Sequence, residues 1–283
     1  MNHAAAPPLL LTRPRPGVVV AALNRPHRMN ALTEDTFRAL SELCAGLGQD
    51  SSARVLVLTG AGEDFCAGYD IDEVGRIAAL PPAELLALLE RQGAAVTALR
   101  DLPQPVVAAV DGAAVGAGLS LALAADVRVL TSRARLRASF VRMGLSGGDM
   151  GASWLLPRIA GYGYASELML TGRPVDADEA LARGLASRVT DPAQLPAAAL
   201  DLAERIAANS PVALALTKRI LQSNTDAPSL AVALEREAST QVVAAGSPDV
   251  QAAVAAFRSR RAPTPEPPTE PSTEPSNTKE APR

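Results

Sequence analysis

The chain has 283 residues, a formal net charge of −3, 48% hydrophobic residues and only 3% aromatic ones. This length suits one large domain or two small ones, and the apolar fraction is ample for a core built of Ala, Val and Leu. The near-balanced charge argues against a general nucleic-acid binder, which needs a basic face. Two cysteines are too few for a disulfide framework, so we expect a reducing compartment, the cytoplasm.

Both ends of the sequence differ from the middle. Prolines and arginines interrupt the N-terminal stretch, so it predicts neither a signal peptide nor a membrane span, and we expect a flexible N-terminus over residues 1–8. Residues 262–283 are rich in Pro, Thr, Glu and Ser and have no apolar face, which predicts disorder. Such a tail either binds a partner or only aids solubility, and its composition favours the second role.

Apolar strand-like runs alternate with helical patterns over the first half of the chain. In order, the sequence predicts a strand at 17–23, a helix at 33–48, a strand at 53–60, a helix at 82–102, a strand at 105–112, a helix at 116–125 and a strand at 126–130. This alternation is typical of a parallel α/β core. Residues 152–261 read as nearly all helical.

Two glycine-containing segments follow predicted strands. They are GAGEDFCAGYDI, residues 60–71, and VGAGLS, residues 115–120, which opens a helix. Because ligands of α/β sheets bind beyond the carboxyl ends of the strands, both segments favour a ligand site. The first N–H groups of a helix are unpaired and lie at the positive end of its dipole, so they can stabilise an oxygen that becomes negative during a reaction. The two segments together predict a pair of backbone donors for such an oxygen.

Other patterns are weaker. Cys66 has no nearby His in the sequence to lower the pKa of its thiol, so a small buried residue is favoured over a nucleophile. GLSGG, residues 144–148, matches a hydrolase nucleophile elbow, but that fold needs a later His, and both His3 and His27 precede the segment. The spacing of residues 112–118 does not meet the dinucleotide fingerprint G-x-G-x-x-G. The His and Cys residues also lack metal-ligand spacing, so we expect no metal site.

Asp149 lies among glycines directly before an apolar helix. It either caps that helix or faces the ligand as a proton-transferring carboxylate, and the sequence leaves both roles open. Burial at a ligand site would raise the pKa of its carboxyl group, which suits general acid–base work.

From about residue 9 to 262 the chain resembles the crotonase superfamily, also called the enoyl-CoA hydratase/isomerase family. The resemblance rests on five segments in the order typical of the family: LNRPHRMNAL (23–32), FCAGYDI (65–71), PVVAAVDGAAVGAGLSLALAADVRV (105–129), LTGRPVDADEALARGLASRV (170–189) and AAFRSRR (255–261). It implies an α/β fold, a spiral of ββα units over 9–195 with a helical trimerisation region over 196–261. It also implies a homotrimer, or a hexamer made of two trimers, that acts on acyl-CoA. Coenzyme A would then be part of the substrate, with no bound cofactor.

In this family two backbone N–H groups hold the thioester oxygen while an enolate forms. The motifs put these donors at Ala67 and Ala117. The resemblance also implies that the first loop runs along coenzyme A and that Arg28 faces its phosphates, although Arg28 could equally be an ordinary surface residue. The other residues expected at the substrate or at coenzyme A are Gly68, Tyr69, Asp70, Ile71, Gly116, Phe140 and Trp154.

The chain departs from the family's hydratases at their two catalytic glutamates. Ser120 and Phe140 stand at those positions, and neither carries a carboxylate. Asp149 matches an acid found in members such as dienoyl-CoA isomerases, within a similar D-x-G-x-x-x-x-L-P pattern. We therefore expect a lyase or isomerase with Asp149 as acid/base, and Ser120 orienting a water or the substrate. Hydration, isomerisation, hydrolysis and dehalogenation stay open, and the alternative is a non-catalytic acyl-CoA-binding module.

Overall fold

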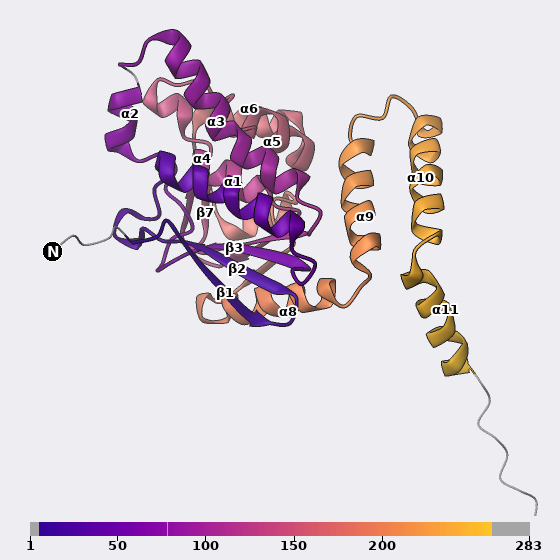
Figure 1. Cartoon of the computed structure of the whole chain (residues 1–283). Helices are drawn as coiled ribbons and strands as arrows, with labels where there is room; N and C mark the ends of the chain where they lie inside the picture. The colour runs from indigo at the N-terminus through magenta and orange to yellow at the C-terminus, as the bar shows by residue number, and fades with distance from the viewer. Residues whose placement is uncertain (1–5, 78, 262–283) are drawn as a thin grey trace, which may run out of the picture.

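The computed structural model describes residues 6–77 and 79–261 (Figure 1). The predicted tail, 262–283, and residues 1–5 of the predicted flexible N-terminus lie outside this range. The strands are β1 Leu9–Arg15, β2 Val18–Leu23, β3 Val55–Gly60, β4 Val106–Val110, β5 Ala113–Val115, β6 Val127–Thr131, β7 Arg135–Arg137, β8 Pro174–Val175 and β9 Arg188–Thr190. The α-helices are α1 Glu34–Gln49, α2 Ile71–Ile77, α3 Pro82–Asp101, α4 Ala117–Ala124, α5 Ala152–Ala160, α6 Tyr162–Thr171, α7 Ala177–Ala182, α8 Leu195–Ala207, α9 Pro211–Asn224, α10 Leu230–Ala245 and α11 Pro248–Arg261.

A large sheet forms the centre of the molecule, with strand order β1-β2-β3-β4-β6-β9. Only the β1–β2 pair is antiparallel; the other neighbours run parallel. The four predicted strands are β2, β3, β4 and β6, so the predicted parallel α/β core is confirmed. β4 is buried along its whole length, as its unbroken run of Val and Ala requires.

Helices cover both faces of this sheet (Figure 1). On one face, α1 and α3 pack over alternate strand residues, and Leu40, Leu58 and Leu99 are fully buried between them. On the other face, α8 buries Ala199 and Ala203 against the intervening strand residues. α8 begins at the predicted domain boundary, 195/196, and it packs on the sheet rather than with the helices that follow it.

A small second sheet, β5-β7-β8, lies at the carboxyl end of β4 and leads into α4. β5 and β7 pair in parallel, and β8 adds to β7 antiparallel. These strands are only two or three residues long, and none of them was predicted. The small sheet is nevertheless what holds the loop after β3 beside the start of α4.

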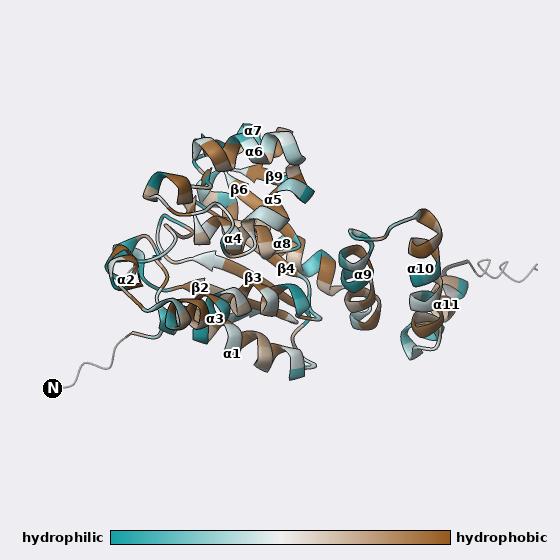
Figure 2. Cartoon of the chain, turned by 90° about the horizontal axis from the view of Figure 1, so that it is seen from above, coloured by the Kyte–Doolittle hydropathy of each residue, from teal (hydrophilic) through white to brown (hydrophobic). Residues whose placement is uncertain are grey.

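The helices α9, α10 and α11 extend away from the sheet layers (Figures 1 and 2). α10 and α11 lie outside the core, and Figure 2 shows hydrophobic (brown) stretches along α9 and α10. The large apolar side chains exposed there include Leu221, Leu230, Leu234, Val242 and Val243. An unpartnered apolar surface of this kind is typical of a protein–protein contact. Over the described ranges, no helix is long and apolar enough to cross a membrane.

Candidate active site

The loop between β3 and α2 is fastened to β5. The Cys66 amide donates to the Ala113 carbonyl at 2.8 Å, and the Val115 amide donates to the Cys66 carbonyl at 2.9 Å. Gly68 has φ +96°, and a Cβ added to it would stand 2.7 Å from the Val115 carbonyl oxygen, so only glycine fits there. The same Cβ would stand 3.5 Å from the Ala117 nitrogen. The loop after β3 therefore meets the beginning of α4.

Ala117 is the first residue of α4, and Gly116 precedes it as N-cap with φ +53°. A first helical residue has no intrahelical acceptor for its N–H. No other group in the described part of the chain accepts the Ala117 N–H. All eight residues of α4 are buried, so the positive end of its dipole acts where water screens it little. This amide is free to bind a ligand oxygen.

The expectation for Ala67 is wrong. Its N–H donates to the carbonyl oxygen of Met29 at 2.9 Å, so it is not available to a ligand. Met29 lies in the loop after β2, with φ +49°, and this loop runs beside the β3 loop. Nothing in the sequence indicates that the Met29 carbonyl, in another loop, accepts a hydrogen bond from the Ala67 amide.

Tyr69 supplies the free amide of the loop instead. Its two neighbours pair with Leu32: the Leu32 amide donates to the Gly68 carbonyl at 2.7 Å, and the Asp70 amide donates to the Leu32 carbonyl at 3.0 Å. Successive amides of an extended segment point to opposite sides, so the N–H of Tyr69 points away from Leu32. Among residues 6–77 and 79–261 it has no acceptor. The pair of unpaired amides is therefore Tyr69 and Ala117.

Ser120 and Phe140, at the positions where the resemblance implies glutamates, are both buried. The one proton of the Ser120 hydroxyl can go to the carbonyl oxygen of Gly116 at 3.4 Å or to that of Asp149 at 3.5 Å. It thus ties α4 to the segment that carries Asp149. The Phe140 ring packs at the start of α4, where a Cβ on Gly116 would stand 3.7 Å from it. Neither side chain can carry a proton between substrate atoms.

Asp149 does not cap the helix that follows it, because the N-cap of α5 is Gly151. Its carboxylate accepts the Met150 N–H at 2.9 Å. Burial raises the pKa of Asp149, while the Tyr69 phenol and the Met150 N–H oppose the rise. A carboxyl group with a raised pKa is suited to taking up and returning a proton near neutral pH.

Tyr69 and Asp149 line the same cavity, of about 230 Å³. Helices α2 and α3 close its other sides with apolar side chains. The described residues that line it are Tyr69, Val74, Ile77, Leu85, Leu89, Leu145, Ser146, Gly148 and Asp149. We call it the acyl cavity, after the acyl chain that the resemblance implies, because this lining is mostly apolar and includes a carboxylate.

The residues expected at coenzyme A form two groups. Asp70 is buried and pairs with Arg25 at 2.7 Å; burial alone would raise the pKa of its carboxyl, but hydrogen bonds from Arg25 and from the Asp72 amide lower it. Asp70 therefore shapes the loop, and Arg25 is a partner that the sequence did not reveal. Ile71, at the start of α2, is 62% exposed, and Arg28 lies at the surface 3.0 Å from Asp72. Ile71 and Arg28 therefore remain open to solvent beside the loop after β3.

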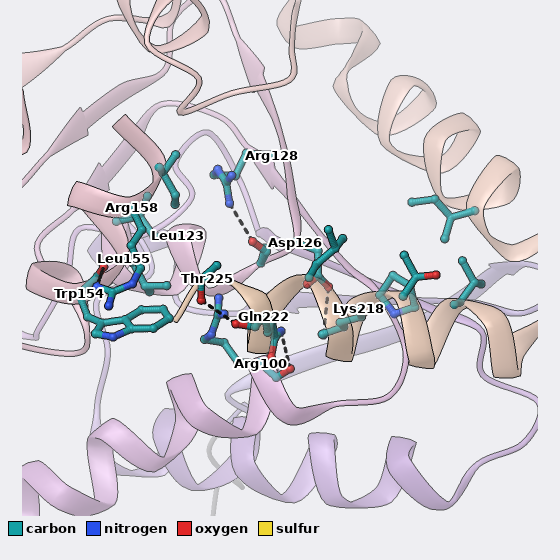
Figure 3. A pocket seen from close by; sticks show the side chains of 17 residues that line it. Arg100, Leu123, Asp126, Arg128, Trp154, Leu155, Arg158, Lys218, Gln222 and Thr225 are labelled. Carbon is teal, nitrogen blue, oxygen red and sulfur yellow. Dashed lines mark hydrogen bonds and ion pairs between the residues drawn. The ribbon is translucent and has the colours of Figure 1, made fainter. Parts of the chain in front are cut away.

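Trp154 is not at this cavity, contrary to expectation. It lines a second, larger cavity of about 370 Å³ between α5, α9 and the sheet (Figure 3). The guanidinium of Arg158 stacks over its ring at 3.9 Å, and that of Arg100 lies at 5.2 Å. The indole is thus in contact with cations of its own chain and does not line the acyl cavity.

The buried cations of this larger cavity hold the fold together. Lys218 on α9 donates to the carbonyls of Leu99 and Gln104 and pairs with Asp126 at 3.0 Å, which uses all three of its protons (Figure 3). Arg128 donates to backbone carbonyls at 2.6 and 2.8 Å. These groups anchor α9 and the end of α4, so the acyl cavity is the better candidate site despite its smaller volume.

Two further expectations concern reactive side chains. Cys66 is buried, and burial raises the pKa of its thiol to about 12, so it is no nucleophile near neutral pH. Among residues 6–77 and 79–261, no group of three His, Cys, Asp or Glu side chains could hold a metal ion.

Comparisons with known proteins agree with this geometry. The model of the family "Enoyl-CoA hydratase/isomerase" matches residues 14–266. The chain is 42% identical to "Probable enoyl-CoA hydratase EchA12" of Mycobacterium tuberculosis, over 90% of this chain and 91% of that protein. A crystal structure of an enoyl-CoA hydratase from Mycobacterium smegmatis superimposes with TM-score 0.84 at 33% identity, covering 91% and 98% of the two chains. A monofunctional enoyl CoA isomerase from M. smegmatis gives TM-score 0.69 at 42% identity, covering 81% and 98%.

The chain therefore belongs to the enoyl-CoA hydratase/isomerase family, the crotonase superfamily. Its α/β fold is that of the family, and it is an acyl-CoA enzyme of the lyase or isomerase kind. This confirms the resemblance seen in the sequence.

Proposed function

We propose that this chain shifts the double bond of an enoyl-CoA thioester. The thioester oxygen lies between the N–H groups of Tyr69 and Ala117, and the acyl chain fills the cavity that ends at Asp149. The Asp149 carboxylate takes a proton from the α-carbon of a 3-enoyl thioester. The electrons move onto the oxygen, and the same proton returns to the γ-carbon, which gives the 2-enoyl thioester. Each backbone donor stabilises the intermediate by about 3–4 kcal/mol.

The observation that carries this proposal is that the described lining of the acyl cavity contains one carboxylate, that of Asp149, and no second acid. Hydration needs a group that activates water and another that handles the proton. Ser120 and Phe140 are buried and engaged with their own surroundings, so they supply neither. A shift of the double bond needs only one group that accepts a proton and gives it back. The likeness to a monofunctional enoyl CoA isomerase supports the same reaction.

Coenzyme A would extend from the Tyr69 and Ala117 amides along the exposed side of the loop after β3. There Ile71 offers an apolar surface, and Arg28 can exchange its exposed partner Asp72 for a phosphate. The apolar side chains that protrude on α10 and α11 support assembly as a homotrimer, or as a hexamer of two trimers, as in the family.

Conversion of 3-enoyl-CoA thioesters of four to ten carbons, followed by the absorbance of the 2-enoyl product, tests the reaction. The Asp149→Asn variant should lose about 10²–10⁴-fold in kcat, because it cannot accept the proton, and should still bind butyryl-CoA. A 3-hydroxyacyl product would identify a hydratase instead. Tight binding of the thioesters without any product would favour the alternative, a non-catalytic acyl-CoA-binding module.

A further inference from the structure

The hydroxyl of Tyr69 is buried, and no described residue forms a hydrogen bond with it. The ring is held by Phe37, with ring centroids 5.8 Å apart and a tilt of 53°. A buried polar group without a partner is costly, and such groups concentrate where a ligand or a proton transfer completes them.

Asp149 carries the carboxylate that can accept a hydrogen bond from the Tyr69 hydroxyl. Both side chains line the acyl cavity, and its other lining side chains are Val74, Ile77, Leu85, Leu89, Leu145 and Ser146. Burial and the nearby Asp149 charge both raise the pKa of the Tyr69 phenol. In return, the phenol opposes the rise that burial imposes on the pKa of Asp149.

We propose that Tyr69 is the positioning residue for Asp149: its phenol donates a hydrogen bond to the carboxylate and turns it toward the acyl chain. The inference rests on the proposed acid/base role of Asp149. Tyr69 then serves both ends of the reaction. Its backbone N–H faces the thioester oxygen, and its side chain orients the group that moves the proton.

Besides Tyr69, one side chain in the described cavity lining can donate a hydrogen bond, Ser146, whose hydroxyl accepts the Gly148 N–H at 3.2 Å and does not titrate near neutral pH. α2 and α3 present only apolar side chains to the cavity. From α4, Ser120 reaches the backbone carbonyl of Asp149 and not its carboxylate. On its own segment, the carboxylate accepts the Met150 N–H. The phenol is thus the one titratable group of the cavity lining that faces Asp149.

A carboxyl titration tests the pairing without requiring turnover. The pKa of Asp149 is measured by NMR on protein labelled with ¹³C at aspartate, and Asp149→Asn assigns the signal. In Tyr69→Phe the ring packing stays and the donor is lost, so the pKa of Asp149 should rise by about one pH unit. The matched control is Tyr164→Phe, because the Tyr164 hydroxyl is also buried without an ordinary partner but lies on α6, away from the cavity.

An unchanged Asp149 titration in Tyr69→Phe would overturn the proposal. If that variant does not fold, 3,5-difluorotyrosine incorporated at Tyr69 serves the same purpose. The fluorinated phenol is a stronger donor, so the pKa of Asp149 should fall, and no shift or a rise would again overturn the pairing. The same substitution at Tyr164 should leave it unchanged.

Kinetics separate this inference from the proposed function. On 3-hexenoyl-CoA, Tyr69→Phe should move the acid limb of the kcat/KM profile upward by about one pH unit, because a carboxylate that is harder to ionise becomes an active base only at higher pH. Full activity of Asp149→Asn would contradict the proposed function. An inactive Asp149→Asn together with an unshifted Tyr69→Phe profile would contradict only the pairing.

Discussion

The hydroxyl of Ser120 lies 3.5 Å from the backbone carbonyl oxygen of Asp149, which can accept its proton. The alternative acceptor for this one proton is the carbonyl oxygen of Gly116, the N-cap of its own helix, at 3.4 Å. Ser120 is fully buried, so its side chain holds two backbone segments together and does not meet solvent. Ser120 thus ties α4 to the segment that follows η2 (Phe140–Met143), where Asp149 lies.

Ser120→Ala should consequently be a variant with small effects. We expect a loss of about 1 kcal/mol in the free energy of unfolding, the worth of an ordinary hydrogen bond. The kcat should stay within about fivefold of the original, because the hydroxyl carries no proton in the reaction. Urea unfolding and turnover of 3-enoyl-CoA check this, with the exposed Ser153→Ala as control. A hundredfold loss of kcat would show that Ser120 acts on the substrate.

The apolar wall of the acyl cavity should set the chain length. Leu85 and Leu86 are neighbours on α3, but only Leu85 lines the cavity, while Leu86 is 59% exposed. Leu85→Phe should lower kcat/KM for decenoyl-CoA at least about tenfold and leave butenoyl-CoA nearly unchanged, since lost space excludes methylene groups. Leu86→Phe is the matched control and should change neither. Equal effects of the two variants would place the acyl chain elsewhere.

The ion pair of Lys218 and Asp126 should hold α9 on the core. The Lys218 ammonium is buried, and its removal leaves the Asp126 carboxylate without its cation. Because Asp126 is partly exposed, Lys218→Met should cost about 2–3 kcal/mol in unfolding free energy, less than a fully buried pair. Hydrogen exchange should increase along α9. Arg219→Met, on the exposed face of the same helix, should have little effect, and equal losses in both would refute the anchor.

The pairing of Asp70 with Arg25 should make stability depend on pH. Hydrogen bonds from Arg25 and from the Asp72 N–H lower the pKa of Asp70 below its ordinary 3.8, against the effect of burial. A carboxyl whose folded pKa is lowered binds fewer protons in the folded state. Its contribution is therefore complete well above pH 3.8 and is lost as the pH falls through the lower, folded value.

Asp70→Asn should thus be less stable than the original protein by about 1–3 kcal/mol at pH 7, and the difference should shrink as the pH falls below about 4. Denaturant unfolding at a series of pH values measures it. Asp35→Asn breaks an exposed pair with Arg38 and should change stability by less than about 1 kcal/mol throughout. A difference for Asp70→Asn that stays constant down to pH 3 would contradict the assignment.

The sequence predicted the central strands well because each is a run of β-branched or small apolar residues buried on both faces. β1 was not predicted, because it is an exposed edge strand containing Pro14 and two arginines. β5, β7 and β8 are too short to show any periodicity, and they form only because the loop after β3 and the segment before α4 pair with each other. Such pairing depends on contacts that no local pattern records.

Contacts between distant segments also explain the two wrong predictions about the site, those for Ala67 and Trp154. Which amide of the loop at residues 66–70 is free depends on the carbonyl of Met29 and on the bridge to Leu32, both from a distant segment. Trp154 is near Asp149 in sequence, but in the first turn of α5 its side chain stacks with Arg158 and lines the other cavity. Asp149 could be singled out from the sequence because a carboxylate among glycines before an apolar helix is a local feature, and its acid/base role stays a prediction.

A crystal structure with bound butyryl-CoA tests the central claim most directly. The account predicts that the thioester oxygen lies about 2.7–3.1 Å from both the Tyr69 and the Ala117 nitrogens, with the Asp149 carboxylate about 3–3.5 Å from the α- or γ-carbon. The Ala67 amide should keep its bond to Met29. An oxygen bound away from these two nitrogens, or an Asp149 carboxylate out of reach of the acyl chain, would contradict the account.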